Sequence, residues 1–167
     1  MPTSPRLRWR RLDRDHVDAF HRLVVDPHVR RFLLDGEQLP REWSAAEVTA
    51  SDALFDRIGL GLWLLAEGDG EPIGFAGFRV FDELGPEPQL LYAFTERVTG
   101  RGLATEAARA LIAAAEAAGL DPIHSAVDGP NAASLRVLAK VGFSVDRVTA
   151  EGAFGEMVWL SRRRGGA

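Results

Sequence analysis

The 167-residue sequence contains no cysteine. Disulfide bonds, thiolate metal sites and cysteine nucleophiles are therefore excluded together. A chain without cysteine fits a reducing cytosol, where disulfides are rare, so we expect a cytoplasmic protein. Its four histidines are scattered and lack the spacing of metal ligands, so we also expect no metal site.

The sequence also lacks an excess of basic residues, because 20 Lys and Arg stand against 24 Asp and Glu, a formal charge of -4. DNA-binding proteins usually carry a basic excess, so we expect no DNA partner. Long hydrophobic runs are missing as well. No apolar run follows the arginine-rich segment 1–14, and the Ala-rich segment 103–120 contains three charged residues. We therefore expect neither a signal peptide nor a membrane segment.

What the sequence does contain is typical of a globular domain, with 46% hydrophobic and 26% charged residues. Its length suits one hydrophobic core and is short for two, so we expect a single domain over residues 1–167. Helical spacing of apolar residues predicts helices over 13–24, 44–58, 103–118 and 131–140, with a short apolar set at 29–33. Strands are predicted over 7–10, 60–66, 73–81, 89–95, 123–127, 143–148 and 153–160.

This order of elements predicts a mixed α/β domain around a central, largely antiparallel sheet. Helix 103–118 is the clearest element, because it has no internal Gly or Pro and is followed by Gly119, a residue that favours a left-handed cap. Segment 82–88, with two prolines and three acidic residues, is expected to be a loop.

The segment between strand 89–95 and helix 103–118 is the most informative. Gly100 and Gly102 allow the backbone to turn tightly and to approach a ligand closely. The helix that starts at Leu103 offers free N–H groups and the positive end of its dipole. Together these features predict a phosphate-binding turn, with Arg97 and Arg101 adding positive charge.

Two nucleotide-binding motifs do not fit this turn. A Walker A loop needs a lysine after its last glycine, and none follows Gly102. The dinucleotide fingerprint lacks its third glycine, since Thr105 stands there, and the acidic Asp121 opens the next strand instead of ending it. By itself, the turn could equally be a helix start that binds no ligand.

Two segments resemble motifs of the GNAT acyltransferase superfamily. Segment 99–107 resembles its acetyl-CoA-binding loop, (Gln/Arg)-x-x-Gly-x-(Gly/Ala), with Gly102 and Ala104 in place and Thr99 departing from the first position. Segment 131–143 resembles its Asn-x-x-Ser-x-x-x-x-x-Lys-x-Gly-Phe pattern. Segment 26–29 and the hairpin 63–77 are similar to the branch that contains the ribosomal-protein N-terminal acetyltransferases.

The resemblance implies a GNAT-like α/β fold, with a central, mostly antiparallel twisted sheet of about seven strands, about four helices on its faces, and splayed strands four and five. It implies transfer of an acetyl or other acyl group from acetyl-CoA to a primary amine of a small molecule or a protein N-terminus. The amine attacks the thioester directly in a ternary complex, and no metal takes part. Dimers are common in the resembled branch, so a homodimer is among the expectations.

Carried over residue by residue, the resemblance also implies a cofactor site. Backbone groups of Phe94 and Thr95 and the side-chain amide of Asn131 would bind the pantetheine arm, and Lys140 would reach a nucleotide phosphate. The pyrophosphate would be held by the amides of Gly100, Arg101, Gly102, Leu103, Ala104 and Thr105. Asn131 is equally suited to be a helix N-cap.

Two positions depart from the family's catalytic pattern. Leu138 stands where many relatives have a tyrosine that protonates the thiolate, so the resemblance points to Ser134 as the acid, although Ser134 also suits a first helical turn. Gln89 stands where many relatives have a glutamate base, which leaves Glu83, Glu87 or a water chain for that role. A catalytically weak or inactive acyl-CoA-binding module therefore stays open as the alternative. The acidic segment 82–88 hints at a cationic acceptor.

Overall fold

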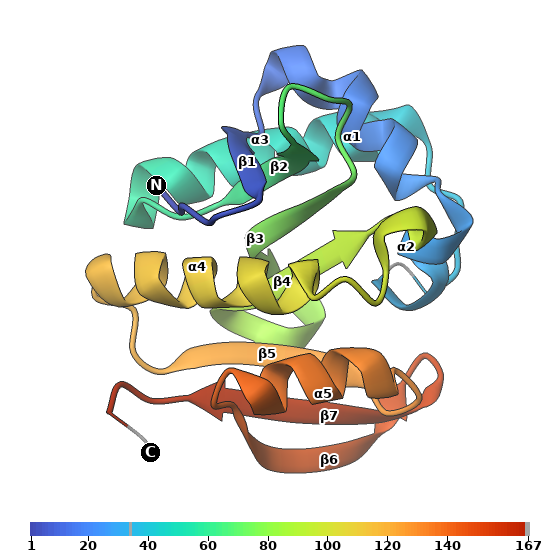
Figure 1. Cartoon of the computed structure of the whole chain (residues 1–167). Helices are drawn as coiled ribbons and strands as arrows, with labels where there is room; N and C mark the ends of the chain where they lie inside the picture. Colours follow the sequence, from blue (N-terminus) through green and yellow to red (C-terminus); the bar gives the residue numbers. More distant parts are fainter. Residues whose placement is uncertain (34, 166–167) are drawn as a thin grey trace.

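The computed structural model describes residues 1–33 and 35–165. Positions 34, 166 and 167 of the expected domain lie outside the described residues. Within the described part, seven strands form one sheet in the order β1-β2-β3-β4-β5-β7-β6, and five α-helices flank it (Figure 1). The predicted mixed α/β fold is confirmed. Neighbouring strands are antiparallel, except for the parallel pair β4 and β5.

The strands are β1 (Leu7–Arg11), β2 (Leu62–Glu67), β3 (Gly74–Phe81), β4 (Gly85–Phe94), β5 (Ile123–Asp128), β6 (Ser144–Gly152) and β7 (Gly155–Arg162). The helices are α1 (Val17–Val24), α2 (Pro27–Leu33), α3 (Arg41–Ile58), α4 (Leu103–Ala117) and α5 (Ala132–Lys140). The short apolar set at 29–33 forms a separate helix, α2, which brings the described helices to five where about four were expected. Gly119 has a φ of 80° and follows α4 as predicted.

The segment expected to be a loop, 82–88, is partly strand. A 3-10 turn covers Asp82–Leu84, and β4 then begins at Gly85. It does so because β4 continues its pairing with β3, where Phe81 lies opposite Gly85 after a register shift. Prolines are tolerated at such irregularities, so Pro86 and Pro88 do not end the strand.

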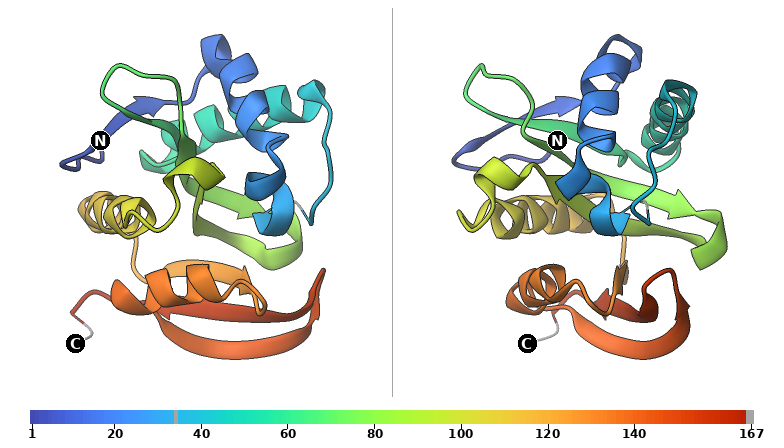
Figure 2. Two further views of the ribbon diagram at one scale, coloured as in Figure 1. Left: turned by 45° about the vertical axis from the view of Figure 1, so that its right-hand side comes forward. Right: turned by 90° about the vertical axis from the view of Figure 1, so that its right-hand side faces the viewer.

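The helices form two layers. Helices α4 and α5 lie on one face of the sheet, and α1, α2 and α3 lie on the other (Figure 2). Side chains of β2 alternate between the two faces of the sheet. Trp63 and Leu65 pack into the core with α4, to which Leu54 and Phe55 near the end of α3 also contribute, whereas Leu62 and Leu64 pack into the core with α1 and the first half of α3. Each face of the central strands is therefore buried.

Strands β4 and β5 separate soon after they meet. Gln89 lies opposite His124, and this is the one backbone pairing between the two strands among the described residues. Ser125 Oγ also donates a hydrogen bond to the Leu90 carbonyl oxygen at 3.0 Å. Beyond this point the strands diverge, which confirms the predicted splay and leaves one edge of β4 open.

Candidate active site

A cleft of about 1100 Å³ lies where β4 and β5 diverge. It reaches both faces of the sheet. We call its two parts the α4 side, lined by the start of α4 and one face of α5, and the α2 side, lined by α2, residues 35–39 and the turn before β4. Residues 90–94 of β4 and 125–128 of β5 form the walls between them.

The turn before α4 has the geometry that a phosphate group needs. Gly100 and Gly102 have φ angles of 75° and 77°, a region that favours glycine. A Cβ on Gly100 would meet no atom within 4 Å, so the surface of the turn is open. Helix α4 has no side-chain cap, and its backbone hydrogen bonds begin with Glu106 N donating to Gly102 O. The amides of the first helical turn are therefore free for an anionic ligand.

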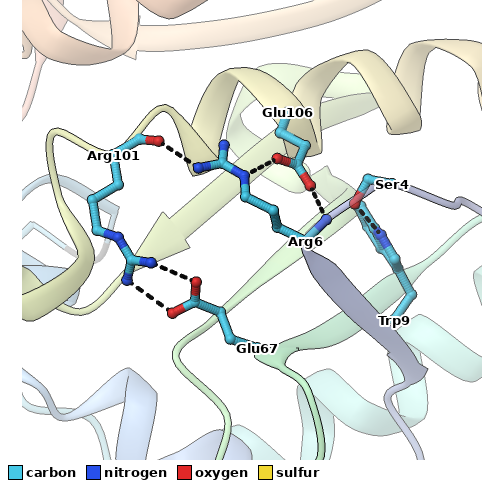
Figure 3. Close-up of polar contacts among 6 residues, drawn as sticks. All are labelled: Ser4, Arg6, Trp9, Glu67, Arg101 and Glu106. Atoms are coloured by element: carbon cyan, nitrogen blue, oxygen red, sulfur yellow. Dashed lines mark hydrogen bonds and ion pairs between the residues drawn. The ribbon is translucent and has the colours of Figure 1, made fainter.

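Four charged residues fix this turn to the neighbouring strands (Figure 3). Arg6 donates to Glu106 from its backbone N at 2.8 Å and from Nε at 2.7 Å, and its Nη1 donates to the Arg101 carbonyl at 2.9 Å. The Arg101 guanidinium donates to both carboxylate oxygens of Glu67 on β2, at 2.8 and 2.6 Å. We call these four residues the clamp. Because Glu67 neutralises the Arg101 side chain, Arg101 offers a ligand chiefly its backbone amide.

The backbone groups of β4 alternate between β3 and the cleft. Thr95 N donates to Ile73 O at 2.9 Å, and the register of β3 and β4 turns the amide of Ala93 toward β3 as well. The N–H groups of Tyr92 and Phe94 therefore point to the open edge. Of the two residues expected to contact pantetheine, Phe94 presents its backbone to the cleft, whereas the amide of Thr95 is already bound.

Helix α5 brings Asn131 and Ser134 to the same cleft. Asn131 Oδ1 accepts a hydrogen bond from Ser134 N at 3.2 Å, so Asn131 is the N-cap of α5. Its Nδ2 group does not take part in that bond and is left for a ligand. Lys140, at the other end of α5, is exposed and also lines the cleft.

The sequence reasoning missed a partner of Ser134. Tyr92 Oη lies 2.9 Å from Ser134 Oγ and donates to the Ser134 carbonyl oxygen at 3.2 Å. Burial raises the pKa of Tyr92 to about 12, although the hydrogen bond with Ser134 lowers it in part. The phenol is therefore protonated at neutral pH. Tyr92 is the one tyrosine of the sequence, and its strand position two residues before Phe94 was the available signal.

The positions where many relatives have their catalytic acid and base, Leu138 and Gln89, lie away from the main cleft, and the two candidate bases Glu83 and Glu87 line different clefts. Leu138 is fully buried in the core with α4. Gln89 is also buried, and with Glu87 and His124 it lines a second, smaller cleft of about 190 Å³. Glu83 lines the main cleft. Of the two acids considered as a base, the structure therefore brings Glu83 to the cleft that also contains Ser134.

Four carboxylates line the α2 side of the cleft: Asp35, Glu37, Glu83 and Asp128. Burial raises the pKa of Asp128, the last residue of β5, and the nearby Asp35 raises it further. Burial likewise raises the pKa of Asp35, with Glu37 and Glu83 adding to the effect. Asp35 thus lies close enough to Asp128, Glu37 and Glu83 for its charge to repel theirs. The sequence reasoning identified Glu83 but did not recognise the other three.

Neither a metal cluster nor a membrane helix is found in the described part of the chain. No group of three or more His, Asp and Glu side chains there could hold a metal ion. No helix among residues 1–33 and 35–165 has the length and apolar character needed to cross a bilayer.

Comparison with solved structures finds close likenesses of fold. An acetyltransferase from Agrobacterium tumefaciens is 25% identical, with a TM-score of 0.77 over 95% of this chain and 91% of that chain. The enzyme from Salmonella typhimurium that modifies the N-terminal serine of ribosomal protein L7/L12 is 20% identical, with a TM-score of 0.78 over 98% of each chain. Spermidine N-acetyltransferase from Vibrio cholerae, solved with CoA and spermine, is 15% identical, with a TM-score of 0.75 over 96% and 97%.

No curated protein matches the sequence. The family model described as "Acetyltransferase (GNAT) domain" matches residues 6–144, which is well over half of the chain. This match includes the turn before α4, β4, β5 and α5, which line the cleft. The chain therefore belongs to the GNAT family of acetyl-CoA-dependent acetyltransferases.

Proposed function

We propose that the protein transfers an acetyl group from acetyl-CoA to the primary amine of a small molecule or a protein N-terminus, by direct attack in a ternary complex. The observation that carries this proposal is that the phosphate-binding turn, the open edge of β4 and Ser134 all line one cleft. Acetyl-CoA supplies an acetyl group that is activated as a thioester.

The α4 side would hold this co-substrate. In the proposal, the backbone amides of residues 100–105 bind the pyrophosphate, because they lie at a helix N-terminus that no side chain caps. Phe94 contributes backbone groups, and Asn131 contributes its Nδ2 group. Thr95 takes part only through groups other than its amide, which Ile73 holds. Lys140 supplies positive charge for a nucleotide phosphate.

Ser134 is proposed as the acid that protonates the departing thiolate. Its Oγ is held 2.9 Å from Tyr92 Oη, so the hydroxyl is oriented within the cleft. A serine hydroxyl is a weak acid, and the neutral phenol beside it supports proton transfer by hydrogen bonding. The N–H groups of Tyr92 and Phe94 on the open edge of β4 are suited to stabilise the oxyanion that forms during attack.

Two measurements test the proposed function. Calorimetric titration with acetyl-CoA should show binding, and a thiol-release assay over small amines and N-terminal peptides should show turnover that depends on an amine. Absence of acetyl-CoA binding would contradict the assignment of the cleft. Binding without turnover on any amine would support the alternative of an inactive acyl-CoA-binding module.

A further inference from the structure

The α2 side of the cleft contains negative charge that the protein does not neutralise. Among the described residues, no Arg, Lys or His forms an ion pair with Asp35, Glu37, Glu83 or Asp128. Asp35, Glu37 and Glu83 are exposed to solvent in the cleft, whereas Asp128 is buried. The negative charge therefore extends from the open part of the cleft to its wall.

The two arginines that line this side are engaged elsewhere. Arg79 donates to both carboxylate oxygens of Glu47 at 2.6 and 3.0 Å, which neutralises its charge. Arg31 lies over the ring of Phe32 at 5.1 Å and is exposed. Arg30, also on α2, donates from Nη1 to the Gly36 carbonyl oxygen, between Asp35 and Glu37. With Arg79 neutralised, Arg30 and Arg31 are the remaining arginines here, and the four carboxylates outnumber them, so the α2 side is negative.

Asp128 gives an independent indication that a ligand binds here. Its side chain lines the cleft, and the residue is only 6% exposed. Its Oδ1 atom is buried and accepts no hydrogen bond from the described residues. A buried carboxylate oxygen without a donor is costly, so a donor supplied by a ligand in the cleft would stabilise this group.

Asp128 also lies close to Ser134 in the cleft wall. Asn131 N donates to the Asp128 carbonyl oxygen at 2.8 Å, and Asn131 Oδ1 accepts from Ser134 N at 3.2 Å. Two hydrogen bonds through Asn131 therefore connect the backbone of Asp128 to the backbone of Ser134. Among the described residues that line the cleft, Asp128 is the one carboxylate that is buried.

We propose that the acceptor is a small amine carrying two or more positive charges, with its reacting nitrogen at Asp128 and its second cationic group among Asp35, Glu37 and Glu83. This inference rests on the proposed function and deepens it by naming the substrate class. Phe32, Trp43 and Phe81 line the same side and offer apolar surface to the alkyl spacer between the charges.

In this proposal Asp128 is the general base. Its carboxylate takes one proton from the ammonium group, and the neutral nitrogen attacks the carbonyl carbon of the thioester. The new C–N bond forms and the C–S bond breaks. The second proton from nitrogen replaces the one that Ser134 gives to sulfur, which yields the free thiol. The proton on Asp128 then passes to solvent, so the base is regenerated.

The substrate class is tested with two amines of equal length. Thiol release is measured with 1,4-diaminobutane and with n-butylamine, at low and at high sodium chloride. We expect kcat/KM for the diamine to be on the order of tenfold higher, and we expect this preference to shrink at high salt because the exposed carboxylates are screened. Calorimetric binding of the two amines should show the same order of affinity.

Variants separate the two parts of the acidic surface. Asp128→Asn should lower kcat for both amines by about a hundredfold or more and leave acetyl-CoA binding unchanged. Glu37→Gln combined with Glu83→Gln should raise KM for the diamine by about tenfold, and should raise KM for n-butylamine, which has no second charge, by much less. Asp69→Asn is the control, because it removes a carboxylate charge from a side chain that is 95% exposed and lies outside the cleft. It should change kcat and KM for neither amine.

Each outcome decides the inference. Equal kcat/KM for the two amines, or a preference for a neutral N-terminal peptide, would overturn the substrate class while leaving the acetyltransferase proposal intact. Full activity of Asp128→Asn would overturn its role as base. Acetyl-CoA binding without turnover on any amine would overturn both proposals. The Glu37 and Glu83 variants alter exposed side chains, so they test the charge preference even if Asp128→Asn does not fold.

Discussion

The two sides of the cleft differ in whether their charged side chains are paired. On the α4 side the clamp residues neutralise one another, so the turn around Gly100 and Gly102 is held in place by contacts within the chain. On the α2 side four carboxylates line the cleft, and among the described residues none of them forms an ion pair. The charged side chains of the α4 side are thus paired with one another, and this side offers a ligand backbone N–H groups. The carboxylates of the α2 side are not paired, so a cationic ligand could neutralise them.

This difference suits the two ligands, because the cofactor is constant and the acceptor varies. A pyrophosphate is the same in every acyl-CoA, so a rigid turn of backbone amides is sufficient to bind it. The acceptor varies between acetyltransferases, and side chains at the mouth of the cleft are the natural means of selecting it. Uncompensated carboxylates lower the stability of the native state, and such costs are common at functional sites.

The largest expected effect comes from adding charge to the α4 side. Gly102→Asp places a carboxylate at the start of α4, so we expect the Kd for acetyl-CoA to rise on the order of a hundredfold or more. Calorimetric titration measures this change. Gly119→Asp is the matched control, because Gly119 has a similar φ of 80° and open space around it but lies at the other end of the helix. Unchanged affinity in Gly102→Asp would remove the phosphate-binding assignment.

A smaller effect is expected at the junction of the two sides. Ser134→Ala should lower kcat about tenfold to a hundredfold, while the Kd for acetyl-CoA stays nearly constant, since the hydroxyl is needed only for proton transfer. Steady-state kinetics and titration measure the two quantities. Tyr92→Phe should show the same split with a smaller loss of kcat. If Ser134→Ala turns over at the wild-type rate, Ser134 is merely a residue of the first turn of α5.

Weakening the clamp should cost stability. Burial acts to raise the pKa of Glu106, but hydrogen bonds from the Arg6 backbone and side chain and from Ser4 lower it below its usual value. This stabilisation is present above the unfolded-state pKa and is lost as pH falls through the lower folded-state pKa. Because Arg6 is half exposed, Glu106→Gln should cost only about 1 kcal/mol at pH 7 and less in acid.

Denaturant unfolding of Glu106→Gln at several pH values checks this expectation. Glu71→Gln is the control, since the Glu71 side chain is 82% exposed and 3.6 Å from Arg22. A loss of stability in Glu106→Gln that is as large in acid as at neutral pH would show that packing, and not charge, accounts for the role of Glu106.

The smallest expected effect is a gain of stability on the α2 side. The folded-state pKa of Asp128 is raised by burial and by Asp35, so its favourable contribution exists below the unfolded-state pKa and is lost as pH rises through the folded-state pKa. Asp128→Asn removes the buried charge and should stabilise the protein by about 0.5 kcal/mol at pH 7. The gain should vanish below about pH 4. Thermal unfolding beside Asp69→Asn checks it, and a loss of stability at neutral pH would contradict it.

Much of the fold could be predicted because its signals are local. Helix α4 was predicted within about a residue at each end, since an Ala-rich run between two glycines is decided by nearby backbone preferences. The predicted start of β4, at Gln89, was wrong, because two prolines suggested a loop over 82–88 and the strand begins at Gly85. Pairing with β3 through Phe81 decided that segment, and such pairing depends on residues distant in sequence.

The site was predictable on one side of the cleft and not on the other. The turn at Gly100–Gly102 and the cap at Asn131 each lie within a few consecutive residues, so their pattern is visible in the sequence. The contact between Tyr92 and Ser134 joins residues 42 positions apart. The group of carboxylates around Asp128 likewise depends on how α2, β4 and β5 meet, which is set by the strand order.

The open edge of β4 has a consequence for how the molecule responds to its ligand. Among the described residues, the parallel strands β4 and β5 share one backbone pairing, between Gln89 and His124. A ligand lying along the open part of β4 would therefore take the place of a neighbouring strand. In hydrogen exchange, the amides of Tyr92 and Phe94 should exchange faster than that of Ala93, which faces β3, until acyl-CoA is added. Binding would then raise the melting temperature of the whole protein, because the ligand joins the two halves of the sheet.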